Sequence, residues 1–300
     1  MAIFVDEVRE APKKKARRSP DGVYRPGREE IRFFMGADAA EAFNKRNDDG
    51  AISILRLSPL VEQAGPVLMD WKWEFVHGMR VRRKTAEEWS GIIHGLHRRL
   101  GLSGIVLDKG GGGGFIAGSL RSRSQLINGT RLDCPPIVTV EDKTAPPDSE
   151  IVLTMFIRSQ LQDMWPAETL KGDDNLIDHA HAIFIEAIES GNVQFPVPLD
   201  DRSAEERKKC EGWDPERAWA IRIISEGLDQ LKHIEAMVDG NGDHVVTRNN
   251  ARQYRSSKRK DIAYSMLFAY MAARLWLKRL EDDWMGEGEQ EDFDVAMGRV

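Results

Sequence analysis

The stretch IRFFMGAD, residues 31–38, decides the fold, because it is a short apolar run that ends in Gly and Asp. This pattern predicts a buried strand whose last residue is an aspartate. Two further strands are predicted over residues 51–57 and 66–76; in the latter, Trp71, Trp73 and Phe75 share one face. The short spacing between the three strands favours an antiparallel meander.

A second strand that ends in aspartate follows the meander. The pattern TAEE at residues 85–88 is a capping box and predicts the start of a helix. Residues 104–108 (GIVLD) are again an apolar run into Asp, and five glycines at 110–114 come next. A helix over 115–127 and a strand over 136–140 complete the order β-β-β-α-β-α-β, which predicts an α/β fold with a mixed sheet flanked by helices.

The rest of the chain is predicted to be mainly helical. Residues 1–30 mix charge with Pro and Gly and are interpreted as an N-terminal arm or linker, and residues 281–300 as an acidic C-terminal tail. The last core helix begins at Asp261 and is apolar around most of its circumference. The predicted helices span residues 151–162, 175–190, 215–238 and 261–280.

The distribution of charge changes what the net charge implies. A net charge of −6 over 300 residues argues at first against binding to nucleic acid. However, residues 281–294 hold eight acids and no Lys or Arg, so residues 1–280 carry 42 basic and 41 acidic residues, a net of +1. Two basic clusters, at 80–84 and 248–260, are either solvated surface or contacts for phosphates.

Three aspartates suggest a metal site. Asp38 and Asp108 end two predicted strands, and if these strands are parallel neighbours their carboxylates converge at one edge of the sheet. Asp261 starts the last core helix. Each acid alone is readily explained as a cap or turn residue, but the three together form the oxygen-ligand set that Mg²⁺ prefers.

Three motifs resemble those of one family. FFMGAD (33–38) with the polar NDDG loop (47–50), IVLDKGGGGG (105–114), and KRKDIAYSMLFAYMAAR (258–274) are similar to the first, second and third motifs of the nuclease domain of viral large terminase subunits, which has the RNase H-like fold. The resemblance covers about residues 31–280, with a helical insertion at about 142–248 that aligns poorly. Relatives often carry Glu where this chain has Asp108.

The resemblance implies a metal-dependent endonuclease that cleaves double-stranded viral DNA concatemers during genome packaging. Asp38, Asp108 and Asp261 would hold two Mg²⁺ or Mn²⁺ ions, with Asp49 and Asp142 as accessory ligands or turn residues. The implied partners are double-stranded DNA, a small terminase subunit and a portal protein, and the implied location is the host cell cytoplasm. The residues expected to contact DNA are Arg80, Arg82, Arg83, Lys84, Lys109, Arg252, Arg255, Lys258, Arg259 and Lys260.

Several function classes are excluded or left open by the sequence. The glycine run lacks the Lys-Ser/Thr of a P-loop, so the packaging ATPase domain is expected to be absent from this chain. No apolar run approaches the length of a membrane span, and the two cysteines form no C-x-x-C pattern. His94 and His97 lack a third ligand for zinc. A Holliday-junction resolvase or other RNase H-like nuclease, and a non-catalytic docking module, remain as alternatives.

Overall fold

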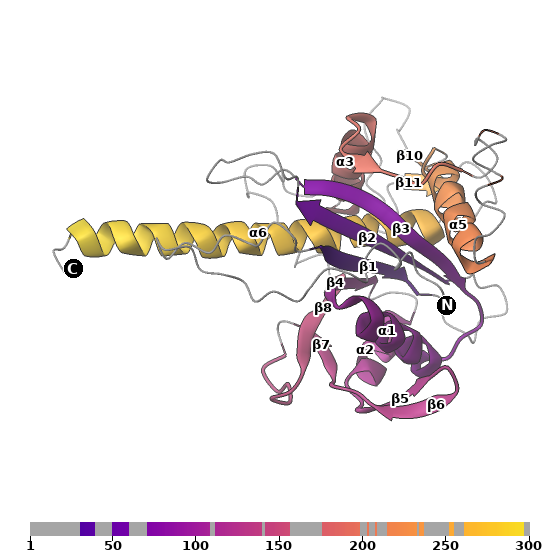
Figure 1. Cartoon of the computed structure of the whole chain (residues 1–300), viewed down its shortest axis with the longest axis horizontal. Coiled ribbons are helices and arrows are strands. Elements are labelled where there is room, and N and C mark those ends of the chain that lie inside the picture. The colour runs from indigo at the N-terminus through magenta and orange to yellow at the C-terminus, as the bar shows by residue number, and fades with distance from the viewer. Residues whose placement is uncertain are drawn as a thin grey trace.

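The computed structural model of the chain describes residues 31–39, 50–59, 71–108, 112–139, 142–156, 176–198, 203, 208, 215–232, 234–236, 252–254 and 261–296. The predicted N-terminal arm, residues 1–30, lies outside these ranges. Figure 1 shows a central sheet with helices on both of its faces.

The main sheet of the described chain has seven strands in the order β7-β8-β4-β1-β2-β3-β9. Strands β1, β2 and β3 form the predicted antiparallel meander, and β4 pairs in parallel with β1. Strands β8 and β7 continue the parallel half, and β9 is parallel to β3. This arrangement is the predicted mixed sheet, in which a three-strand antiparallel meander is joined to parallel strands. The bounds are β1 (Arg32–Asp38), β2 (Gly50–Pro59), β3 (Trp71–Val81), β4 (Leu102–Asp108), β7 (Ile137–Thr139), β8 (Glu150–Phe156) and β9 (Val193–Gln194).

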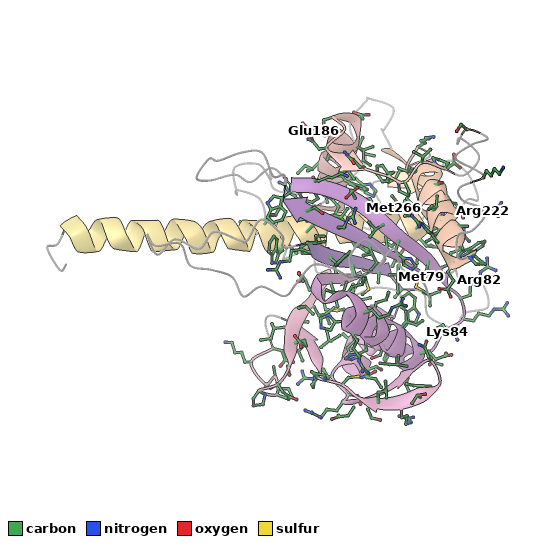
Figure 2. The ribbon with its side chains drawn as sticks, viewed as in Figure 1. Met79, Arg82, Lys84, Glu186, Arg222 and Met266 are labelled. Carbon is green, nitrogen blue, oxygen red and sulfur yellow. The ribbon has the colours of Figure 1, made fainter. Side chains whose placement is uncertain are left out.

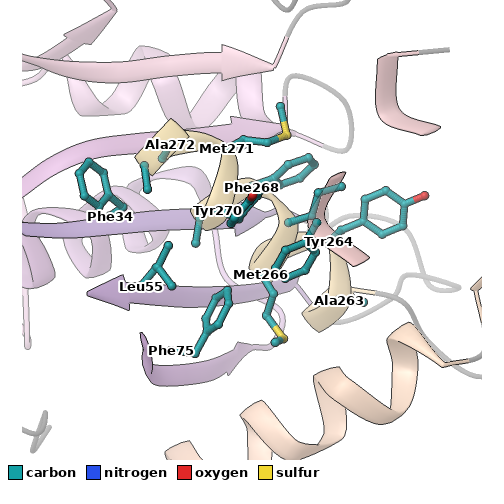
Figure 3. Close-up of a cluster of buried hydrophobic side chains, with 14 of the residues drawn as sticks. Phe34, Leu55, Phe75, Ala263, Tyr264, Met266, Phe268, Tyr270, Met271 and Ala272 are labelled. Carbon is teal, nitrogen blue, oxygen red and sulfur yellow. The ribbon is translucent and has the colours of Figure 1, made fainter. Parts of the chain in front are cut away.

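The helices divide between the two faces of the sheet. The helices α1 (Ala86–Leu100) and α2 (Gly113–Leu120) pack on one face against a core that includes Met35 and Ile54. The helices α3 (Leu176–Glu189), α5 (Pro215–Leu231) and α6 (Asp261–Ala296) cover the other face, where Phe34 and Leu55 pack against α6 (Figure 3). None of the described helices is both long enough and apolar enough to cross a membrane.

The capping box predicted for residues 85–88 is present at the start of α1. The Thr85 hydroxyl accepts a hydrogen bond from the Glu88 backbone N–H, and the Glu88 carboxylate accepts one from the Thr85 N–H. At the other end, Gly101 adopts a left-handed conformation with φ 63°, which closes the helix. These two caps define the ends of α1, the helix that connects β3 to β4.

Two predicted helices are wrong in whole or in part. The helix predicted over 115–127 ends at Leu120, because residues 124–127 form β5 (Ser124–Ile127) and pair with β6 (Thr130–Asp133). Asn128 and Gly129 turn between them with positive φ angles, as in the Asn-Gly turns of hairpins. Of the helix predicted over 151–162, the described residues 151–156 belong instead to β8, whose near-continuous apolar run suits a strand between two parallel neighbours. Residues 157–162 lie outside the described ranges.

The remaining helices differ from the prediction mainly at their ends. Helix α3 matches the predicted helix, whereas α5 ends at Leu231 and is followed by the small antiparallel pair β10 (Ile234–Ala236) and β11 (Arg252–Tyr254). Helix α6 continues to Ala296, through most of the predicted acidic tail, and projects well beyond the sheet in Figure 1. The segment 142–248 contributes the core strand β8 as well as α3 and α5.

His77 is a buried histidine of β3 that makes stability dependent on pH. It is 4% exposed, and neither ring nitrogen has a hydrogen-bond partner among the described residues. Burial lowers the pKa of His77 to about 4, and the nearby charge of Arg99 acts in the same direction. Between pH 6.5 and pH 4, His77 is therefore protonated in the unfolded chain but neutral in the folded chain. The free energy of unfolding falls as the pH falls through this range.

We expect His77→Leu to remove part of this acid sensitivity. The shift corresponds to a loss of about 3 kcal/mol once the pH is below 4, of which about 2 kcal/mol is expected between pH 7.5 and pH 5. Urea unfolding of both proteins at pH 7.5 and pH 5 measures it, and the wild type should lose more stability on acidification than the variant. Burial also lowers the pKa of His94 to about 4, so some sensitivity persists in His77→Leu. An equal loss in both proteins would contradict the assignment to His77.

Candidate functional site

The two predicted strand-end aspartates lie on neighbouring parallel strands. Strands β1 and β4 are in register up to the pair Ala37–Leu107, so Asp38 and Asp108 are the next residue of each strand. Adjacent strands are about 5 Å apart, which places the two backbones side by side at the carboxyl edge of the sheet. The adjacency on which the sequence argument depends is therefore present.

Both aspartates belong to the face of the sheet that α6 covers. Side chains alternate along a strand, so Asp38 shares its face with Gly36, and Asp108 shares its face with Val106. A Cβ atom added to Gly36 would lie 2.1 Å from the Ser265 carbonyl oxygen of α6. Val106 belongs to the core cluster that contains α6. Each aspartate is partly exposed at this edge.

Asp261 starts α6 at the same edge. Gly36 lies against residues 265–269 of α6, and Phe34 lies against Trp276 with ring centroids 5.6 Å apart. The helix therefore runs antiparallel to β1, with its first residue towards Asp38. Asp38 lies about 7 Å beyond Gly36 along the strand, and Asp261 lies about 6 Å from Ser265 along the helix in the same direction. Asp261 is 7% exposed.

The first turn of α6 is held by α5. The side-chain Oε1 of Gln230 accepts hydrogen bonds from the backbone N–H groups of Ile262 at 3.1 Å and Ala263 at 3.0 Å. Gln230 is 4% exposed. The sequence analysis did not identify this residue, although one signal was available. A buried helix that follows Lys260 has no acceptor in the preceding side chain and must find one elsewhere.

The basic cluster at 80–84 lies at the same edge as the aspartates. Asp38 is paired with Ala51, and Ala51 with Arg80, so Arg80 is two strands from Asp38 in one row across the sheet. The Arg80 guanidinium forms an ion pair with Glu226 of α5, and its side chain is 14% exposed. Arg82 and Arg83 are exposed in the turn after β3. Figure 2 shows Arg82 and Lys84 between β3 and α1.

The other predicted DNA contacts are less defined. Lys84 donates to the Glu88 carboxylate at 2.7 Å, as part of the start of α1. Arg252 belongs to β11, outside the main sheet. The predicted contacts Lys109, Arg255, Lys258, Arg259 and Lys260 lie outside the described residues, as does the accessory residue Asp49.

Asp142 is occupied by structural contacts. It follows β7, which is separated from β4 by β8. Its carboxylate accepts from the Thr144 hydroxyl at 2.8 Å and the Thr144 N–H at 3.0 Å, and it forms an ion pair with Arg121. The hydrogen bonds from Thr144, together with the Arg121 charge, hold the pKa of Asp142 below its usual value. These contacts explain Asp142 as a turn residue without a ligand.

The chemistry of the strand-end and helix-start acids suits a hard divalent cation. All three predicted ligands are carboxylates, and Mg²⁺ binds through one or two carboxylates and completes its shell with water and substrate phosphates. Within the described ranges, which include Asp38, Asp108 and Asp261, no three His, Cys, Asp or Glu side chains form a group that could hold a metal ion, so the structure does not bring these three carboxylates together as a cluster. The positive end of the α6 dipole also favours negative charge at this edge.

The comparisons with known proteins give two structural matches. No family model matches the sequence, and no curated protein matches it. The structure is similar to the large terminase nuclease from thermophilic phage G20c, with 14% identity, a TM-score of 0.42, and coverage of 81% of this chain and 82% of that chain. A second structure of that nuclease, with bound magnesium, matches with 16% identity, a TM-score of 0.43 and the same coverage.

Proposed function

We propose that this chain is a divalent-metal-dependent endonuclease that cleaves double-stranded viral DNA concatemers during genome packaging. One observation supports it above the others. Asp38 and Asp108 end adjacent parallel strands, on the sheet face covered by the helix that Asp261 starts. The three sequence motifs that resemble terminase nucleases contribute these three acids in that order.

Each residue has a role in this proposal. Asp38, Asp108 and Asp261 would hold Mg²⁺ or Mn²⁺, and two such ions would supply an activated water and stabilise the leaving 3′ oxygen. Arg82 and Arg83 contact phosphates without reading sequence, because phosphate contacts carry no base information. A small terminase subunit would choose the site, and a portal protein and packaging ATPase would deliver the DNA.

Incubation of the purified chain with supercoiled plasmid tests this function. We expect nicked and linear products in Mn²⁺ or Mg²⁺ and none in EDTA. A preference for four-way junctions over linear duplex would favour the resolvase alternative. No cutting in either metal, with the packaging ATPase supplied in a parallel reaction, would favour the non-catalytic docking module.

The exposed arginines after β3 give a separate prediction about binding. Each phosphate contact contributes about 0.9 to the slope of log affinity against log salt, so Arg82→Ala with Arg83→Ala is expected to lower this slope by about 2. Titration of a labelled duplex in EDTA measures binding without cleavage. Arg98→Ala is the matched control, since Arg98 is exposed near the end of α1, at the opposite edge of the sheet. Equal slopes in all three proteins would remove Arg82 and Arg83 from the interface.

A further inference from the structure

Phe115 is an aromatic side chain that lies in solvent in the first turn of α2. It is 73% exposed, against 52% for Trp219 of α5. Helix α2 is anchored to the sheet by Ile116 and Leu120, which are buried, so the Phe115 ring is not part of the contact that holds the helix. Single exposed apolar side chains are common on protein surfaces, so the surroundings of Phe115 must decide whether it has a role.

The exposed face of α2 presents this one ring and little else. Gly114 and Gly118 share the face with Phe115. A Cβ atom added to either glycine would have no heavy atom within 4 Å, so the space on both sides of the ring is open. The core of a protein–protein interface combines several aromatic and aliphatic side chains, whereas this face supplies one. The face therefore suits a ligand that accepts a single flat ring.

Helix α2 begins directly at the end of β4. A Cβ atom added to Gly113 would collide with the carbonyl oxygen of Asp108, so the first turn of the helix lies against the last residue of the strand. Phe115 is two residues further on, which is about 3 Å along the helix axis. Side chains of a helix lean towards its N-terminus, so the Phe115 ring leans towards the strand end that carries Asp108.

Phe115 and the arginines after β3 lie at the two ends of one row of strands. The strands β4, β1, β2 and β3 are consecutive neighbours, and Asp108 and Asp38 end the first two of them. Three strand spacings of about 5 Å give about 15 Å between the ends of β4 and β3, which is comparable with the major groove of DNA, about 12 Å wide. The first turn of α2 also contains no acidic residue that would repel phosphates.

We propose that Phe115 binds duplex DNA by inserting its ring between base steps, next to the phosphates that lie along the carboxyl edge of the sheet. Phe side chains insert between base steps in this way and partly unstack them. Stacking on an aromatic ring tolerates any sequence, because every base has a π-face. This inference rests on the proposed function and deepens it, since it adds a base contact to the phosphate contacts of Arg82 and Arg83. It does not require a bound cation.

Titration of a labelled duplex in EDTA, at a series of salt concentrations, tests the role of Phe115. We expect Phe115→Ala to weaken binding by about 10-fold at every salt concentration. The slope of log affinity against log salt should stay at its wild-type value, because no cation has been removed. Phe115→Trp keeps an aromatic ring and should bind within about threefold of wild type. A duplex that contains 2-aminopurine, whose fluorescence rises when it is unstacked, should brighten with wild type and not with Phe115→Ala.

Ile151→Ala is the matched control for the loss of an exposed apolar side chain. Ile151 is 56% exposed at the start of β8, which is parallel to β4 and pairs its last residue with Asp108, so Ile151 lies at the opposite edge of the sheet. This variant should bind DNA like wild type. Wild-type affinity in Phe115→Ala, a changed salt slope, or an equal loss in Ile151→Ala would overturn the role of Phe115 and leave the proposed function standing. Failure of the wild type to bind the duplex at any salt concentration would overturn both.

Discussion

Asp38→Asn and Asp108→Asn are each expected to reduce metal-dependent DNA cleavage by about 100- to 1,000-fold without loss of folding. Asn keeps the size and shape of the side chain and removes its negative charge. Loss of a cation's electrostatic contribution costs several kcal/mol in the transition state, and each 1.4 kcal/mol is about tenfold in rate. Single-turnover plasmid cleavage in Mn²⁺ measures the effect.

The same two variants should be at least as stable as wild type when no metal is present. Two carboxylates on adjacent strands repel each other, so removal of one charge relieves this repulsion. A structural cap behaves in the opposite way, because its loss costs about 1 kcal/mol. Urea unfolding in EDTA therefore distinguishes a ligand from a cap without any reference to activity.

Asp142→Asn is the control for a carboxylate at the same sheet edge. Its carboxylate is bonded to Thr144 and Arg121, so its loss should cost some stability and leave cleavage within about threefold of wild type. If Asp38→Asn retained cleavage, or if Asp142→Asn lost as much as Asp38→Asn, the assignment of the metal ligands would be wrong.

The predictable part of the fold came from patterns that local physics determines. The apolar run before Asp38 and the alternation of Trp71 and Trp73 define strands because burial and side-chain direction leave little choice. The capping box at Thr85 defines a helix start for the same reason. The parallel pairing of β1 with β4 then follows from the helix between β3 and β4, since a crossover connection returns the chain in the same direction.

The errors came from segments whose structure depends on distant partners. Residues 150–156 are apolar enough for either a helix or a strand. They form the strand β8 because they pair with the side of β4 that β1 does not occupy. Leu126 and Ile127 look like the end of α2, but the Asn128–Gly129 turn pairs them with β6. The cap from Gln230 joins residues more than 30 positions apart in the sequence, so no local pattern contains it.

The position of the site residues along the backbone could be predicted from the sequence, but the contacts of their side chains could not. The sequence placed Asp38 and Asp108 at strand ends, and their adjacency needed only the correct order of β1 and β4. The pairing of Arg80 with Glu226 was not predictable, because Glu226 is one of several acids on α5. An argument from charge alone therefore could not show that the Arg80 guanidinium is paired with Glu226.

Gly36→Ala is expected to lower the free energy of unfolding by about 3 kcal/mol. The new Cβ would lie 2.1 Å from the Ser265 carbonyl oxygen and 2.2 Å from the Ala269 backbone nitrogen. Both atoms belong to the α6 backbone, so no side-chain rotation relieves the clash and the helix must move. Overpacking of this kind costs about 1–3 kcal/mol and occasionally more. Urea unfolding measures the loss.

Gly118→Ala is the matched control, because the same substitution has the opposite expected sign there. Gly118 is an exposed residue of α2, and a Cβ added to it has no neighbour within 4 Å. Replacement of glycine by alanine in an exposed helix stabilises it by about 0.5–1 kcal/mol. A comparable loss in both variants would show that glycine itself, and not the contact with α6, determines the result.

Gly36→Ala also tests whether the site depends on how α6 is docked. Displacement of α6 from β1 moves Asp261 relative to Asp38, which is two residues from Gly36 on the same strand. Under conditions in which the variant is fully folded, its Mn²⁺ affinity should therefore fall, and cleavage should fall with it. The hydroxyls of Ser53 and Ser265 lie 2.7 Å apart across the same contact between the sheet and α6. Loss of this hydrogen bond would therefore report displacement of the helix independently of Mn²⁺ binding. Wild-type Mn²⁺ affinity in folded Gly36→Ala would mean that Asp261 is not a ligand, since a ligand carried by α6 cannot keep its place when the helix moves.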